Sequence, residues 1–217
     1  GGLYAWGKNS TGNMGIAANP GSSPTNYRRS SPVQLGGSTN ADHKWRTVTS
    51  DSWSAQLGTK TDGTLWAWGE NSSGNLGQGN TTKQSSPVQI PGTTWAQASM
   101  SLYSSWATKT DGTLWAWGNN QNGLLCQNNR TSRSSPVQIG GGTDWSVVDG
   151  GHGTFMAKKT DNTLWMAGAN NQGQLGNNNR TYYSSPVQIP GTTWNNICSG
   201  NYQSFATKTD GTLWGWG

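Results

Sequence analysis

The chain has 217 residues and a formal net charge of +5, and only 11% of its residues are charged, against about 25% in ordinary domains. A mean hydropathy of −0.75 would suit a disordered chain, but the 14 Trp exclude that class because disordered chains lack aromatic residues. The modest charge without a basic tail disfavours nucleic acid as a partner, and the sequence has no apolar run of about 18 residues, so we expect no membrane span.

A nine-residue pattern recurs along the chain and, with no 3.6-residue apolar period beside it, predicts an all-β fold. It reads TDGTLWAWG at 61–69 and 110–118, TDNTLWMAG at 160–168 and TDGTLWGWG at 209–217, and its tail opens the chain at 1–7. Asp-Gly and Asp-Asn favour a two-residue type I′ hairpin loop, because Gly and Asn tolerate positive φ. Such a loop would place Thr207 opposite Trp214 and Phe205 opposite Trp216.

The same order of signals follows each copy. A turn of the form N-x-x-G-x-L-G leads through a polar loop to SSPVQ(I/L), where Pro suits a strand entrance. A Trp then starts a second short strand, and a strand of the SFATK type enters the next hairpin. Four short strands in 49 residues predict one antiparallel sheet for each period. We therefore divide a single domain, 1–217, into repeats at about 8–69, 70–118, 119–168 and 169–217, with 1–7 as a duplicated strand.

The strands carry apolar groups on both faces, so each sheet must lie between similar sheets, as a propeller blade does. The pattern G-T-L-W-x-W-G-x-N-x-x-G-Q-L-G…P…W…G-x-x-x-S-F-A resembles the repeat of the regulator of chromosome condensation family over essentially the whole chain. The resemblance implies a β-propeller, usually of seven blades of about 50 residues. Within such a blade we interpret TDGTLWAWG as the inner structural hairpin.

Four repeat periods and a duplicated strand are fewer than the resemblance implies for a whole propeller. We therefore expect the chain to form part of a larger propeller of about seven blades, whose end faces need neighbours. A closed four-bladed ring with one spare strand is the alternative. Two departures from the pattern, Ala167 in place of Trp and Cys126 in place of Gly, indicate local repacking.

Catalytic chemistry has few candidates in this sequence. The two His, His43 and His152, lie in different repeats without metal-ligand spacing, and four of the nine acidic residues are the turn Asp of the repeated hairpin. No zinc spacing, phosphate-binding glycine loop or GxSxG motif occurs. Cys126 and Cys198 fall at non-equivalent positions, and we interpret them as unpaired, with a disulfide as the alternative. The sequence therefore predicts a protein that is not an enzyme and uses no metal or cofactor.

Basic and aromatic residues recur in the loop that precedes SSPV, and they are the candidate partner-binding residues. They are Tyr27, Arg28, Arg29, Lys83, Arg130, Arg133, Arg180, Tyr182 and Tyr183. Equivalent propeller loops share a face, so these side chains should form an arc, and Arg and Tyr are favoured at protein interfaces. A solvated rim is the alternative interpretation. A second set lies near the start of the SFATK strand, at a blade edge or in a site: Trp53, Tyr103, His152 and Tyr202.

These features predict a non-enzymatic module that recognises a protein or a glycan through its blade loops. One alternative is a structural surface or virion protein that assembles with other copies through open blade ends. The family resemblance adds another alternative, because members of that family exchange the nucleotide of a small GTPase and bind chromatin. The surface rich in Asn, Ser, Thr and Gly favours an extracellular, virion or cell-surface location.

Overall fold

The computed structural model describes residues 2–16, 28–35, 44–51 and 54–217, and its regular elements are all β-strands. The strands form five antiparallel sheets, which confirms the predicted all-β class. Three sheets are complete and have four strands each: β3 (Trp45–Ser50), β4 (Ala55–Lys60), β5 (Leu65–Gly69) and β6 (Gln84–Ile90); β7 (Trp95–Ser101), β8 (Ser104–Lys109), β9 (Leu114–Gly118) and β10 (Arg133–Gln138); β11 (Trp145–Gly151), β12 (Thr154–Lys159), β13 (Leu164–Gly168) and β14 (Tyr183–Ile189). The two end sheets hold β1 (Leu3–Lys8) with β2 (Arg28–Leu35), and β15 (Trp194–Ser199) with β16 (Ser204–Lys208) and β17 (Leu213–Trp216).

The complete sheets are out of phase with the sequence periods. Each sheet begins at a Trp strand and ends at an SSPVQI strand that follows the LWAWG strand in sequence. The SSPVQI strand folds back onto LWAWG, so that Leu65 pairs with Ile90 and Leu164 with Ile189. The periods 70–118, 119–168 and 169–217 therefore each contain the last strand of one blade and the first three strands of the next.

The predicted type I′ hairpin loop is wrong, because the loop has three residues. The Lys208 N–H donates to the Thr212 carbonyl over 2.9 Å, and the Gly211 N–H donates to the Lys208 carbonyl over 3.0 Å. Asp210 has no positive φ, whereas Gly211 has φ +85°, as in a type I turn followed by a left-handed residue. The Asp210 carboxylate accepts hydrogen bonds from both the N–H and the hydroxyl of Thr212, which draws this Thr into the turn.

The extra loop residue shifts the strand register by one position from the prediction. Trp214 pairs with Ala206 instead of Thr207, and Trp216 pairs with Ser204 instead of Phe205. Because side chains alternate along a strand, a shift of one residue changes which side chains share a face.

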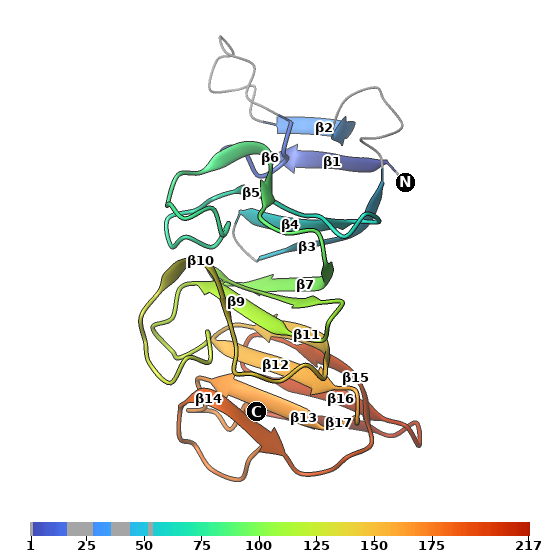
Figure 1. Cartoon of the computed structure of the whole chain (residues 1–217), viewed down its shortest axis with the longest axis vertical. Helices are drawn as coiled ribbons and strands as arrows, with labels where there is room; N and C mark the ends of the chain where they lie inside the picture. The colour runs from blue at the N-terminus through green and yellow to red at the C-terminus, as the bar shows by residue number, and fades with distance from the viewer. Residues whose placement is uncertain (1, 17–27, 36–43, 52–53) are drawn as a thin grey trace.

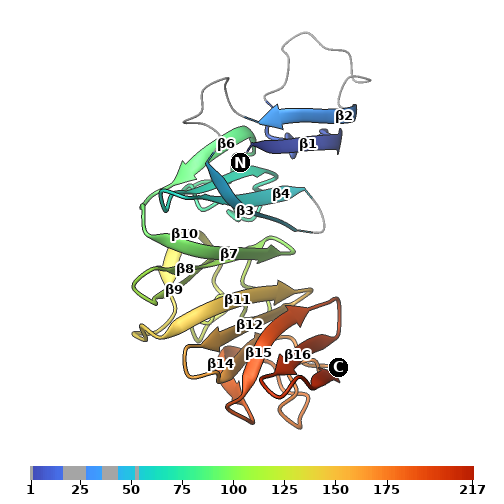
Figure 2. The ribbon, with the colours of Figure 1, turned by 90° about the vertical axis from the view of Figure 1, so that its right-hand side faces the viewer.

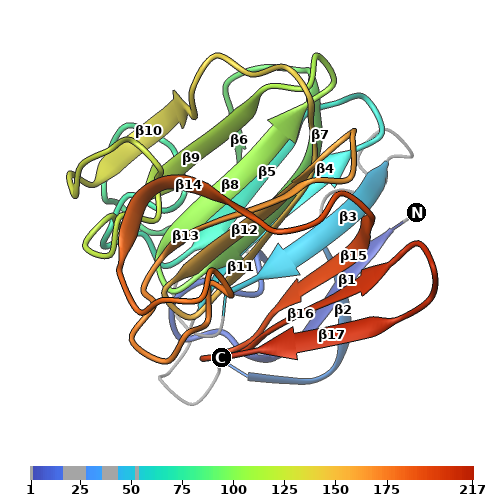
Figure 3. The same cartoon turned by 90° about the horizontal axis from the view of Figure 1, so that it is seen from below.

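The blades stack face to face, from β1 and β2 at one end to β15, β16 and β17 at the other (Figures 1 and 2). The first strands of neighbouring blades contact each other, since β7 contacts both β3 and β11, and β11 contacts β15. These first strands form the inner side of the array (Figure 3). The TDGTLWAWG hairpins join the second and third strands, which are the central pair of each complete sheet. The chain forms β-propeller blades, and among the described residues β2 pairs with β1 and not with β17, so pairing of these two strands does not close a four-bladed ring.

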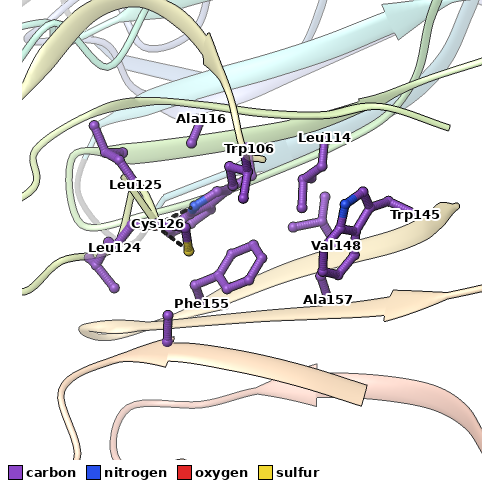
Figure 4. Packing of buried hydrophobic residues seen from close by; sticks show 12 residues of the cluster. Trp106, Leu114, Ala116, Leu124, Leu125, Cys126, Trp145, Val148, Phe155 and Ala157 are labelled. Carbon is purple, nitrogen blue, oxygen red and sulfur yellow. Dashed lines mark hydrogen bonds between the residues drawn. The ribbon is translucent and has the colours of Figure 1, made fainter. Parts of the chain in front are cut away.

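Large apolar side chains fill the spaces between blades. The cluster between the blade of β7–β10 and the blade of β11–β14 includes Trp106 and Phe155, whose ring centroids lie 6.0 Å apart (Figure 4). Similar clusters lie on either side of it along the array. At the two ends of the described array the corresponding faces have no neighbour, and the side chains of Trp6, Leu213 and Trp214 are exposed. No helix among the described residues is long and apolar enough to cross a membrane.

The two departures from the repeat pattern are one coupled change. In the other blades the Trp of WG donates through Nε1 to a loop carbonyl of the preceding blade, as Trp117 does to Asn75 over 2.9 Å. A Cβ atom at Gly77 in that loop would lie 2.9 Å from the Trp117 Nε1 atom, so the pair requires glycine. Cys126 occupies the position equivalent to Gly77 with φ +57°, and the facing Trp is replaced by Ala167.

Another side chain between the same two blades makes the hydrogen bond that Ala167 cannot make. Trp106 donates through Nε1 to the carbonyl of Leu124, the position equivalent to Asn75, over 2.9 Å. A Cβ atom at Gly150 would lie 2.2 Å from the Trp106 ring, so the neighbouring first strand uses glycine to admit this ring. The predicted local repacking is therefore a transfer of one indole donor between adjacent blades.

Candidate functional site

Two sets of chain connections emerge from the same end of each sheet. In one blade Ser101 pairs with Ser104, Ser104 pairs with Gly118, and Gly118 pairs with Arg133. The turn between the first and second strands and the loop between the third and fourth strands therefore share this end, which we name the loop face. The TDGT hairpins lie at the opposite end, which we name the hairpin face. Both predicted sets of site residues belong to the loop face.

Buried Asn side chains hold the loops between the third and fourth strands in shape. Asn71 is fully buried; its Oδ1 accepts from the Leu76 N–H over 2.9 Å, and its Nδ2 donates to the Thr82 carbonyl over 2.9 Å. Asn120 and Asn170 make the equivalent contact with Leu125 and Leu175. Buried polar groups satisfied in this way fix a conformation, so the loops present their exposed residues from a rigid frame.

The predicted arc occupies the outer part of the loop face. Exposed side chains are those of Arg28, Lys83, Arg130, Arg133, Arg180 and Tyr182. Arg29 is half-buried, and Tyr183 is a packing residue in part, because its ring contacts the core and its hydroxyl accepts from Asn179 Nδ2 over 3.1 Å. Tyr27 lies outside the described residues. Within the part of the chain that the structure describes, none of these Lys and Arg side chains forms an ion pair, so the arc is available to an acidic surface.

A pocket of about 480 Å³ opens at the inner part of the loop face, where the first strands end. Its lining includes Ser50, Met100, Leu102, His152, Ser199 and Asn201, which come from four successive blades. His152 joins two of them, since its N–H donates to the Gly200 carbonyl over 3.0 Å and its ring lies 5.4 Å from that of Tyr202. The second predicted set is thus partly brought together: His152 contacts Tyr202, Tyr103 adjoins Leu102, and Trp53 lies outside the described residues.

The turn between β7 and β8 has an unusual backbone for its sequence. Leu102 has φ +37° and Tyr103 has φ +69°, a left-handed conformation that side chains other than Gly, Asn and Asp rarely adopt. Each such residue costs about 1–3 kcal/mol unless the surroundings impose it. The Tyr103 carbonyl accepts from the Asn119 N–H over 2.7 Å, which helps to hold the turn. Strain of this kind concentrates at binding sites, and here it lies at the rim of the pocket.

Near the pocket the half-buried carboxylate of Asp149 links three blades. Asp149 on β11 accepts from the Ser99 hydroxyl of β7 over 3.0 Å and from the Ser199 N–H of β15 over 2.7 Å. Burial raises the pKa of Asp149 above its usual value of 3.8, although these hydrogen bonds act in the opposite direction. Among the residues that line the pocket, His152 is the one ionisable side chain, and the described residues contain no cluster of metal-ligating groups.

Sequence reasoning missed a second repeated feature, on the hairpin face. Each of Lys60, Lys109, Lys159 and Lys208 places its ammonium over two Trp rings, at 4.1–5.0 Å from their centroids. Such contacts contribute about 0.5–2 kcal/mol each. The sequence signal was the Lys two residues before each turn Asp, and the pairing of the first strand with the second brings that Lys opposite the Trp of the first strand, as in the pair of Lys109 with Trp95.

The known proteins that are similar to this chain resemble it in its repeat and its fold. Residues 62–104, 111–157 and 161–207 match the family model of the regulator of chromosome condensation (RCC1) repeat. Human WBSCR16 is similar over 100% of this chain and 57% of its own, with 19% identity and a TM-score of 0.84. Yeast RCC1 (Prp20), in its complex with Kap60, is similar over 99% of this chain and 51% of its own, with 21% identity and a TM-score of 0.80.

A further structure, Prp20p from Saccharomyces cerevisiae described with its binding to Gsp1p and histones, covers 98% of this chain and 65% of its own, with 16% identity and a TM-score of 0.59. The chain therefore spans about half the length of the first two of these proteins. The search of curated proteins found no match. At these identities the structures establish the propeller fold and carry no partner across to this chain.

Proposed function

The chain belongs to the regulator of chromosome condensation repeat family, and from this premise we propose that it is a non-enzymatic protein-recognition module whose partner binds on the loop face. The observation that carries the proposal is the pocket of about 480 Å³ at the inner part of that face. Four blades line it, and its polar and apolar side chains surround a strained turn. A pocket of this size accepts a few side chains of a partner, which is how protein interfaces are anchored.

The outer arc determines the kind of partner surface that fits. Arg28, Lys83, Arg130, Arg133 and Arg180 are exposed on successive loops in the outer part of the loop face. Cations arranged in this way attract an acidic surface and accelerate association more than they tighten binding. We therefore expect a partner with an acidic rim around one or two anchoring side chains, and binding that weakens as salt rises.

Proteins of similar fold that bind other proteins support the proposal. Yeast RCC1 (Prp20) is bound to Kap60 in one structure, and Prp20p is described with binding to Gsp1p and histones. Protein binding is common to these cases. Nucleotide exchange on a small GTPase and chromatin binding are finer functions that the same proposal would include, if the partner proves to be such a protein.

Site-specific photocrosslinking in extract of the source cells tests the proposal. A photoreactive amino acid at position 182 or 202 lies on the loop face, and the same group in place of the exposed Thr160 provides a matched control on the hairpin face. We expect a protease-sensitive adduct of discrete mass from positions 182 and 202 and none from position 160. Equal adducts from both faces, or adducts removed by nuclease or glycosidase but not by protease, would exclude the proposal.

Alanine substitutions on the loop face then separate binding from folding. Arg130, Arg180 and Tyr202 are exposed, so their replacement should leave the melting temperature nearly unchanged. Replacing all three should weaken binding of the crosslinked partner by about 30-fold or more, if they include a hot spot of about 2 kcal/mol. Tyr183 is unsuitable for this test, because its contacts with the core make its replacement a change in stability.

A further inference from the structure

A second cleft lies between the blade of β3–β6 and the blade of β7–β10, and it shares no lining residue with the inner pocket of the loop face. It has a volume of about 390 Å³, and its lining includes Gln78, Pro91, Trp95, Lys109, Trp115 and Ser135. The Lys109 ammonium lies 4.8 Å from the ring centroid of Trp95 and 4.1 Å from that of Trp115. Indole faces attract a cation, but they do not accept the directed hydrogen bonds that an ammonium group donates. The two indole rings therefore hold the Lys109 ammonium in place without accepting hydrogen bonds from its N–H groups.

Another blade of the same chain shows what such an ammonium binds. Lys159 lies over Trp145 and Trp165 in the same way, and its Nζ atom also forms an ion pair with Asp144 Oδ2 at 3.2 Å. Across the described ranges this is the one ion pair of the chain. In the blade of β11–β14, Asp144 therefore supplies the carboxylate that pairs with the Lys159 ammonium.

The residue that supplies this carboxylate differs in the blade of Lys109. Asp144 directly precedes Trp145, and Thr94 directly precedes Trp95. Both positions have the same backbone placement, because the Asp144 carbonyl accepts from the Thr160 N–H and the Thr94 carbonyl accepts from the Thr110 N–H, each over 2.8 Å. Lys109 consequently lacks the carboxylate that Lys159 has, and the cleft occupies the space beside it.

The indole N–H groups of the cleft and the nearby hairpin carboxylate are engaged. The Nε1 atoms of Trp95 and Trp115 donate to the Pro91 carbonyl and the Thr113 hydroxyl over 3.2 Å and 2.9 Å. Asp111, the nearby hairpin carboxylate, accepts from the N–H and the hydroxyl of Thr113. Asp161 is held identically by Thr163 in the blade where Lys159 still pairs with Asp144, so the hairpin Asp does not substitute for the missing group.

We propose that the cleft at Lys109 binds a carboxylate, and that its ligand is an Asp or Glu side chain of a protein. The Lys109 ammonium binds the carboxylate of the ligand. The indole faces and Pro91 pack against the methylene groups of the ligand side chain and against the residue next to it in the ligand chain. An aspartyl side chain is favoured over an acidic sugar because Asp144, the internal occupant of the equivalent site, is one. The site adds an acidic-peptide contact at a place separate from the inner pocket proposed for the main partner.

Titration with N-acetyl-aspartate, followed through the indole N–H signal of Trp115 by NMR, tests this site directly. We expect a saturable shift with a dissociation constant on the order of millimolar, as a single charge-assisted contact allows. Lys109→Met should abolish the shift. Thr94→Asp should also abolish it while retaining the fold, because it supplies the internal carboxylate that the blade of Lys159 already has.

The blade of Lys159 provides the matched controls. Lys159→Met should leave the Trp115 titration unchanged, because Lys159 lies over Trp145 and Trp165 in another blade, and Asp144→Thr should create a further site reported by the Trp165 signal. A Trp115 shift that persists in both Lys109→Met and Thr94→Asp would overturn the proposal. Saturation by glucuronate but not by N-acetyl-aspartate would overturn the assignment to a protein side chain. If Lys109→Met does not fold, the Thr94→Asp titration decides, because that variant adds an ion pair and removes none.

Discussion

Substitution of Gly77 by Ala tests the packing rule that links each loop to the next blade. A left-handed backbone, φ +69° at Gly77, costs a non-glycine residue about 1–2 kcal/mol. The new Cβ atom would also lie 2.9 Å from the Trp117 Nε1 atom, and forcing such an atom into a filled core costs about 1–3 kcal/mol. We therefore expect Gly77→Ala to lower the free energy of unfolding by roughly 2–5 kcal/mol.

Gly79 supplies the matched control, because it shares the backbone conformation without the contact. Its φ is +72°, and the nearest atom to an added Cβ is the Ser135 hydroxyl oxygen at 3.4 Å, so only the backbone cost of about 1–2 kcal/mol applies. Cys126→Ala, which keeps a Cβ atom where the facing Trp is absent, should also lose less than Gly77→Ala.

Urea unfolding measures the difference between these variants as a change in midpoint at constant slope. The extra 1–3 kcal/mol at Gly77 corresponds to a melting temperature roughly 2–12 °C below that of Gly79→Ala for a chain of this size. Equal losses at Gly77 and Gly79 would refute the reasoning, because they would show that the Trp117 ring does not dictate the glycine.

Three further predictions concern the core, the half-buried carboxylate and the assembly state. Trp106→Phe removes the donor to the Leu124 carbonyl and should cost about 1–3 kcal/mol; an unchanged urea midpoint would contradict this. Because burial raises the pKa of Asp149 above 3.8, its contribution to stability is present below pH 3.8 and is lost as pH rises through the raised pKa. Asp149→Asn should flatten that part of the profile of unfolding free energy against pH, and a profile identical to that of the original chain would argue against it. The recognition module predicts a constant mass of 23.1 kDa in sedimentation at all concentrations, whereas assembly through open blade ends predicts a mass that rises with concentration.

The sequence repeat made the architecture predictable, whereas the strand register of the hairpins depended on turn contacts that the prediction did not include. Period, strand composition and the apolar character of both faces led to the propeller, which the structure confirms. The hairpin register could not be read from Asp-Gly alone, because that dipeptide also suits a three-residue loop. The deciding contact is the double hydrogen bond from Thr212 to Asp210, and the sequence contains it as the Thr that follows each Asp-Gly.

The placement of the candidate residues on one face was predictable, and the burial of each side chain was less so. Equivalent loops of a propeller share a face, and this placed Arg130, Arg180 and Tyr182 correctly among exposed residues. Burial of Tyr183 was not predictable, because it depends on how the loop closes onto the core. The inner pocket was also beyond the sequence, since its lining from Ser50 to Asn201 combines turns of four blades that no local pattern connects.

On the loop face the residues at equivalent positions differ more between blades than they do on the hairpin face. This difference determines which face can bind a partner specifically. At the hairpin face the Asp–Thr turn and the lysine between two Trp rings recur in blade after blade. At the inner loop face the equivalent turns present Leu102, His152 and Asn201 to one pocket. A partner without rotational symmetry can be positioned uniquely only by side chains that differ between blades. The loop face meets that requirement at its inner pocket, whereas the hairpin face meets it in the blade of Lys159, where Asp144 fills the lysine site that Thr94 and Thr193 leave without a carboxylate.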